Sequence, residues 1–158
     1  MRRGFTMIEL IFVIVIIGIL AAVAVPKLAA NRDDATAGVC ATEFGNIVSA
    51  ITTTYAKKGY TGFQTVKISD IFNGKTGASG SDSGVVEAGT SNVKDGITYN
   101  CEGASAATIG FALSGSDYNM TITETGNTAT VPATIKAGEL IRKNYHIGSA
   151  GGSKIIGL

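Results

Sequence analysis

The stretch that decides the fold is MRRGFTMIELIFVIVIIGILAAVAVP, residues 1–26. Its 21 residues from Phe5 to Val25 are apolar or glycine, except for Thr6 and Glu9. As a helix this segment would be about 31 Å long at ~1.5 Å per residue, which matches the hydrocarbon thickness of a bilayer. The sequence therefore predicts a membrane-length apolar helix that contains one carboxylate.

Glu9 is the unusual residue of this segment. An acidic side chain within a bilayer costs roughly 2.5–3.5 kcal/mol, so it normally faces a partner and marks a functional site. No cation lies within the apolar run, because the two N-terminal arginines precede Gly4 and the next cation is Lys27. We therefore expect the partner of Glu9 to be created by processing or to come from another chain.

Two ordinary interpretations of this N-terminus leave features unexplained. A secretory signal peptide has an apolar core of ~7–15 residues and a small-residue cleavage site, for which Ala22-Val23-Ala24 would serve. The apolar run is longer than that, and Glu9 interrupts it. A plain single-span anchor, held in the cytoplasm by its basic start, fits the length but gives Glu9 no purpose.

The segment GFTMIEL at 4–10, followed by an apolar tract with Gly18 and closed by Pro26, resembles the N-terminus of a type IV prepilin. The resemblance implies that a prepilin peptidase cuts after Gly4 and methylates the new amine of Phe5. It also implies that this amine pairs with Glu9 of a neighbouring subunit, which compensates both charges in an apolar setting. In filaments of the family the stretch corresponding to Gly18–Pro26 is often locally unwound.

We expect four parts: a cleaved leader at 1–4, a transmembrane and filament-core half-helix at 5–26, an amphipathic half-helix at 27–58 and an extracytoplasmic β domain at 59–158. By resemblance, the precursor sits in the inner membrane with a cytoplasmic N-terminus. The resemblance also implies that the mature chain polymerises into an extracellular type IV pilus for adhesion, motility or DNA uptake. Its implied partners are further copies of itself, prepilin peptidase, the inner-membrane assembly machinery and, before assembly, lipid.

Two other functions remain open at this point. One is a pseudopilin of a type II secretion system, which builds a short periplasmic fibre. The other is a membrane-anchored binding module, for which Glu9 should be replaceable by leucine without loss of function. Long surface filaments favour the pilin, whereas a secretion defect without filaments favours the pseudopilin.

The charge pattern argues against a nucleic-acid partner. Lys and Arg total 13 and Asp and Glu 12, and removal of the two leader arginines leaves 11 against 12. The cations are scattered, without aromatic side chains placed among them for base stacking. We predict no direct nucleic-acid binding.

After Pro26 the sequence has the period of an amphipathic helix. One face is apolar and comprises Cys40, Phe44, Ile47, Val48, Ile51 and Tyr55. The opposite face carries Asn31, Asp34, Glu43, Asn46, Thr53 and Lys57. Gly59, which follows two lysines, is expected to end the helix. Gly18 and Pro26 each weaken a helix interior, so a kink is expected there.

The remainder of the chain predicts an antiparallel sheet of about four strands. Alternation with period two marks Ile97–Cys101, Ile109–Leu113 and Tyr118–Ile122, with Thr128–Ile135 as a weaker fourth strand. The apolar helix face is the natural cover for this sheet, which gives an α+β fold of two layers. Smaller expectations are a helical turn at Ser69–Phe72 capped by Ser69, a surface loop at Gly74–Asn92, a short helix or irregular segment at Ala137–Tyr145, and an edge strand at Ser153–Leu158.

Cys40 and Cys101 lie on the two apolar faces that this packing brings together. They form either a disulfide or two separately buried thiols, because a sequence does not fix a Cα separation. In an oxidising compartment a bridge across so long a loop would contribute about 4 kcal/mol.

The remaining candidate sites are modest. Asn119 begins an Asn-Met-Thr glycosylation sequon, with Asp117 two residues before it. His146 has no nearby cysteine or acid pair and is expected to be an exposed polar residue. Asp82, Glu87 and Asp95 match no calcium-ligand spacing. We predict no catalytic residue, no metal and no cofactor, and hence a protein that is not an enzyme.

Overall fold

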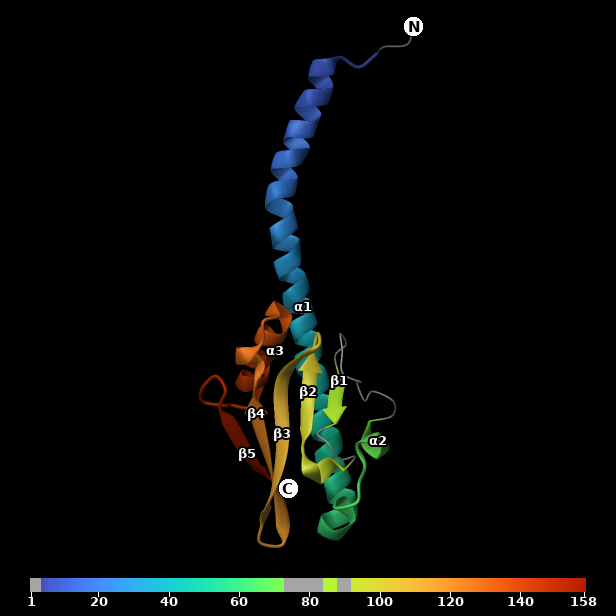
Figure 1. Cartoon of the computed structure of the whole chain (residues 1–158), viewed down its shortest axis with the longest axis vertical. Coiled ribbons are helices and arrows are strands. Elements are labelled where there is room, and N and C mark those ends of the chain that lie inside the picture. Colours follow the sequence, from blue (N-terminus) through green and yellow to red (C-terminus); the bar gives the residue numbers. More distant parts are fainter. Residues whose placement is uncertain (1–3, 73–83, 88–91) are drawn as a thin grey trace. The chain divides into compact units, whose positions relative to one another are not determined.

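The computed structural model of the chain describes residues 4–72, 84–87 and 92–158. The chain divides into two compact units, Met1–Asp33 and Asp34–Leu158. Helix α1 (Met7–Phe63) runs through both units (Figure 1). Among the described residues it is the only regular element of the first unit, and its later part contributes to the core of the second.

Helix α1 stays helical through Gly18 and Pro26, and Gly59 is the residue whose backbone leaves the helical region (φ 62°, ψ −177°). The expected end of the first helical segment at Gly59 is confirmed, and a second, short helical segment follows this break and continues to Phe63. Phe63 is fully buried, and its ring lies 5.2 Å from that of Tyr55. Burial of this aromatic side chain explains why the last turn persists beyond the glycine.

The second unit contains a five-stranded antiparallel sheet in the order β1-β2-β3-β4-β5. Its strands are β1 (Gly84–Glu87), β2 (Ile97–Cys101), β3 (Ala104–Ser114), β4 (Asp117–Glu124) and β5 (Ser153–Gly157). The α+β fold class is thus confirmed, as are the three alternating strands and the C-terminal edge strand. The sheet has five strands instead of about four.

Two segments differ from expectation. The predicted strand at Thr128–Ile135 instead spans the end of η2 (Gly126–Thr128) and the start of helix α3 (Pro132–Asn144). Proline is favourable in the first turn of a helix, and Ala133, Ala137 and Ile141 are buried at helical spacing. Strand β1 lies within the predicted loop Gly74–Asn92, where Val85 and Val86 form too short an apolar run to predict a strand. Apart from β1 and Asn92, this loop lies outside the described residues. Asn92 makes an isolated β-bridge with Lys67.

The short helix α2 (Ile68–Ile71) begins one residue earlier than predicted. Its N-cap is Lys67, not Ser69, and the Asp70 carboxylate accepts a hydrogen bond from the Lys67 N–H at 3.2 Å. Ile68 is fully buried, so packing of this isoleucine positions the turn.

The core of the second unit lies between the apolar face of α1 and one face of the sheet. All six predicted apolar positions of the helix face are buried. On the sheet, the buried face includes Ile109, Tyr99, Met120 and Ile122. Polar contacts also join the two layers: the Tyr99 hydroxyl donates to Glu43 at 3.1 Å, and the Tyr55 hydroxyl donates to Asp117 at 3.0 Å.

Candidate functional site

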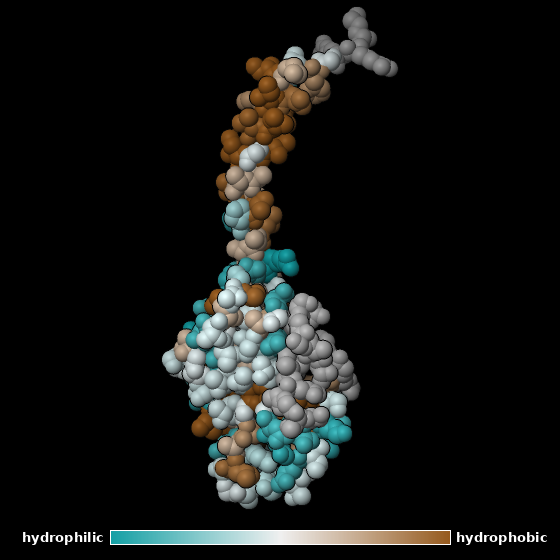
Figure 2. Space-filling model, viewed as in Figure 1, coloured by the Kyte–Doolittle hydropathy of each residue, from teal (hydrophilic) through white to brown (hydrophobic). Residues whose placement is uncertain are grey.

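The first unit presents an apolar surface that the described residues leave exposed. Large apolar side chains from Phe5 to Leu28 are exposed, with Phe5 88% and Phe12 66% accessible. An 18-residue window of α1 has a mean hydropathy of 3.1, and none of it is buried, so the helix is long and apolar enough to cross a membrane. Figure 2 shows these side chains along the N-terminal part of the helix. Such a surface needs lipid or other apolar helices around it.

Thr6 and Glu9 form a capping box at the start of α1. Glu9 Oε2 accepts hydrogen bonds from the Thr6 backbone N–H at 2.8 Å and from the Thr6 hydroxyl at 2.9 Å. In return, the Glu9 N–H donates to Thr6 Oγ1 at 3.4 Å, and the Thr6 carbonyl accepts from the Leu10 N–H at 3.3 Å. This reciprocal arrangement satisfies N–H groups that an apolar surrounding would leave unpaired.

The capping box changes the interpretation of Glu9. The absence of a cation from the apolar run predicts that the carboxylate needs a partner from processing or from another chain, whereas the Thr-x-x-Glu pattern before this run is typical of a capping box. In the structure the carboxylate has local hydrogen-bond donors while the leader residue Gly4 is still attached. A cationic partner would therefore interact with a Glu9 carboxylate that already accepts hydrogen bonds from Thr6.

The junction that the resemblance assigns to processing lies just before the helix. Gly4 and Phe5 are exposed and non-helical, and no side chain would obstruct a Cβ at Gly4. Residues 1–3 of the leader lie outside the described residues. Accessible, non-helical backbone at this junction suits cleavage by a peptidase.

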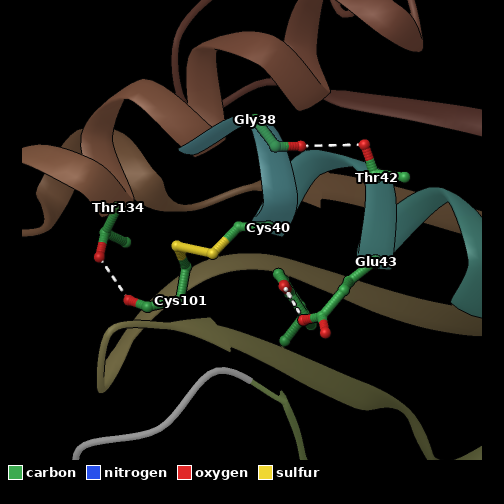
Figure 3. The surroundings of a disulfide bond; sticks show 7 residues. Gly38, Cys40, Thr42, Glu43, Cys101 and Thr134 are labelled. Carbon is green, nitrogen blue, oxygen red and sulfur yellow. Dashed lines mark hydrogen bonds between the residues drawn. A yellow bond between two sulfur atoms is a disulfide. The ribbon is translucent and has the colours of Figure 1, made fainter. Parts of the chain in front are cut away.

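Cys40 and Cys101 are joined by a disulfide between α1 and the end of β2, with a Cα separation of 5.9 Å (Figure 3). Both cysteines are buried, at 1% and 0% exposure. The Thr134 hydroxyl of α3 donates to the Cys101 carbonyl at 2.5 Å, which adds a third element to the junction. This cluster fixes α1, the sheet and α3 to one another within the second unit.

The remaining predicted residues lie apart from both clusters. Asn119 is half-buried on β4, and His146 is exposed just after α3. His146 lines a cavity of about 680 Å³ beside α3 together with Lys136, Arg142 and Asp34, of which Lys136 and Asp34 form an ion pair at 2.5 Å. Within the described residues no group of three His, Cys, Asp or Glu side chains is arranged to hold a metal ion. Of the three acids considered for calcium, Asp95 forms an ion pair with Lys94 at 2.8 Å, and Asp82 lies outside the described residues.

The described residues thus combine a long apolar N-terminal helix, capped by Thr6 and Glu9, with a helix-on-sheet domain that follows it in the chain. Residues 1–25 match the family model for the prokaryotic N-terminal methylation motif. The chain therefore carries a type IV prepilin-like, class III signal peptide, and its precursor is membrane-anchored. Comparisons with curated proteins and with solved structures find no match.

Proposed function

We propose that this protein is the structural subunit of a type IV pilus. A prepilin peptidase cleaves after Gly4 and methylates Phe5, and the inner-membrane assembly machinery moves the processed chain from lipid into a helical extracellular filament. The observation that carries the proposal is an uncovered apolar helix that starts with a capped carboxylate, in a segment that matches the methylation motif. Adhesion, motility and DNA uptake are the activities that such a filament supports.

The capping box supports a two-stage role for Glu9. In the precursor, Thr6 supplies two hydrogen bonds to the carboxylate, so the acid can be held at the membrane without a counter-charge. Cleavage creates a cationic amine at Phe5, and in the filament Glu9 pairs with that amine of a neighbouring subunit. The charge pair forms only when the neighbour is in the correct register, so it selects processed subunits and aligns them.

The apolar helix has corresponding roles in the two environments. Lipid covers the side chains from Phe5 to Val25 before assembly, and the same helices of neighbouring subunits cover them in the filament. When the helix moves from lipid into the filament, its apolar side chains stay out of water, so the hydrophobic contribution to the free energy changes little. Specificity must then come from polar groups, of which the charge pair at Glu9 is the strongest that this segment offers.

Electron microscopy of the producing cells, together with a secretion assay after deletion of the gene, tests this proposal. We expect long surface filaments that contain the chain and disappear on deletion, with unchanged protein secretion. Loss of secretion without surface filaments would instead identify a pseudopilin. Normal function of a Glu9→Leu variant, in the absence of any fibre, would identify a membrane-anchored binding module.

A further inference from the structure

Asn119 lies in the middle of β4, on the face of the sheet that points away from α1. The side chains of Tyr118, Met120 and Ile122 alternate with it and are buried under the helix. Asp117, Asn119 and Thr121 share the opposite face, where Asp117 is exposed and the other two are half-buried. The three polar side chains are therefore displayed together along one extended strand.

Packing gives no reason for an asparagine at this position. Asparagine is disfavoured inside strands. Among the described residues its carboxamide makes no hydrogen bond, although its backbone pairs with both neighbouring strands. A half-buried carboxamide without a partner contributes nothing to the stability of the sheet.

The neighbours of Asn119 leave space above it. The residues directly opposite are Ala112 on β3 and Gly157 on β5, and Gly110 lies opposite Thr121. A Cβ added at Gly110 would meet no atom within 4 Å, and one at Gly157 would meet only the Asn119 Oδ1 atom, at 3.8 Å. The positions directly opposite Asn119 thus carry only small residues, although Ile155 of β5 lies opposite Thr121 on the same face, and this leaves room beside the carboxamide for an attached group.

We propose that Asn119 is an N-glycosylation acceptor. Of the eight asparagines in the chain, Asn119 is the one followed by a residue other than proline and then by serine or threonine. The donor class is an oligosaccharide linked to a polyprenyl diphosphate. The amide nitrogen forms a bond to the anomeric carbon of the sugar, the bond from that carbon to the diphosphate breaks, and the amide gives up one proton as the lipid diphosphate leaves.

Attachment precedes completion of the sheet. Strand β4 is paired on one side by β3 and on the other by β5, so the finished sheet holds the acceptor segment along both edges. Strand β5 is the last element of the chain and joins β4 only after α3 has been made. The acceptor is thus open while the chain emerges from the membrane, and the folded domain then accommodates the sugar on its solvent face.

This inference depends on the extracytoplasmic placement of the β domain under the proposed function. The experiment is mass spectrometry of the protein isolated from the cells that produce it, after reduction and trypsin digestion. The relevant peptide runs from 95 to 136, since no Lys or Arg interrupts it. We expect its mass to exceed the unmodified value by that of an oligosaccharide, with fragmentation placing the addition on Asn119.

Four variants test the assignment and control for it. Asn119→Gln and the shape-matched Thr121→Val should both lose the added mass, whereas Thr121→Ser should keep it. Asn127→Gln changes an exposed asparagine outside the sequon and should also keep it. An unmodified 95–136 peptide, or added mass that survives Thr121→Val, would overturn the inference. If the same sample contains an N-terminal peptide that starts at methylated Phe5, the proposed function stands while this inference fails.

Discussion

At the scale of single residues, Glu9 has two separable roles that the structure makes testable. As the N3 residue of the capping box it accepts two hydrogen bonds from Thr6, and glutamine is able to do the same. As the proposed partner of a neighbour's amine it must carry a negative charge, which glutamine lacks. Glutamine and leucine therefore distinguish the local role from the role between subunits.

We predict that Glu9→Gln leaves the precursor stable and correctly cleaved but reduces filament yield to the level of Glu9→Leu. Removal of one partner of a buried ion pair costs about 3–5 kcal/mol, because the other charge is left without compensation. The measurement is the amount of subunit in sheared filaments relative to the amount in membranes. Assembly of Glu9→Gln at the level of the native protein would mean that the cap alone matters.

The buried tyrosine on β2 provides a pH-dependent test of the domain core. Burial, followed by the nearby Glu43 carboxylate, raises the pKa of Tyr99 above its ordinary value. The folded state therefore retains a proton that the unfolded chain loses above pH ~10. The contribution of Tyr99 to the free energy of unfolding is therefore fully present below that pH and is lost as the pH rises further.

We expect the free energy of unfolding of the detergent-solubilised protein to fall as the pH rises above ~10. Tyr99→Phe should make this fall less steep, even though it removes a hydrogen bond and lowers stability at neutral pH. Urea unfolding at several pH values, followed by circular dichroism, measures both slopes. Equal slopes for the two proteins would show that Tyr99 does not ionise on unfolding in this range.

At the scale of secondary-structure elements, close backbone contact fixes α3 against the segment after β4. A Cβ added at Gly138 would lie 2.6 Å from the Glu124 Oε1 atom and 2.9 Å from the Cα atom of Gly126. Glu124 is 2% exposed and accepts hydrogen bonds from the backbone N–H groups of Asn127 and Gly151, so it has little freedom to move away. Glycine at 138 is thus required by contact distance.

Gly138→Ala should destabilise the protein by about 1–3 kcal/mol through overpacking. Gly45→Ala is the matched control, because it lies within α1 and its added Cβ would meet no atom within 4 Å. Alanine at that position should be neutral or slightly stabilising. Thermal unfolding of the two variants in the same detergent compares them, and equal melting temperatures would contradict the contact argument.

The elements that the sequence could predict are those with a strong repeating pattern. The apolar face of α1 and strands β2, β3 and β4 follow helical and alternating periods, so their burial could be foreseen. Strand β1 has only two valines as its apolar signal, and its place comes from pairing with β2. The start of α3 was not predicted, because the Thr- and Val-containing segment around it resembles a strand, although Pro132 is favourable in the first turn of a helix.

The candidate sites show a similar division. The signal peptide, the acid at Glu9 and the facing positions of the two cysteines follow from sequence and periodicity. The Thr-x-x-Glu pattern of the capping box is visible in the sequence, but the pattern alone does not decide between a local role of Glu9 at the helix start and a role in pairing with another group. The close approach at Gly138 and the small neighbours of Asn119 depend on pairing of distant segments, which a single sequence does not specify.

At the scale of the whole molecule, the disulfide makes the β domain depend on an oxidising compartment. Cys40 and Cys101 are 61 residues apart, and a bridge of this span contributes about 4 kcal/mol in the chain-entropy account. Cys40→Ala combined with Cys101→Ala should lower the free energy of unfolding by about that amount. Denaturant titration of the solubilised protein measures the loss, and unchanged stability of the double variant would remove the disulfide from the account.

The most direct test of the central claim is the N-terminal sequence and mass of the subunit in filaments sheared from the cell surface. We predict a subunit that begins at Phe5, with one methyl group on its amine, because cleavage after Gly4 creates the charge that Glu9 is proposed to meet. A filament subunit that begins at Met1, or after Ala24 as a secretory signal peptide would require, would contradict it.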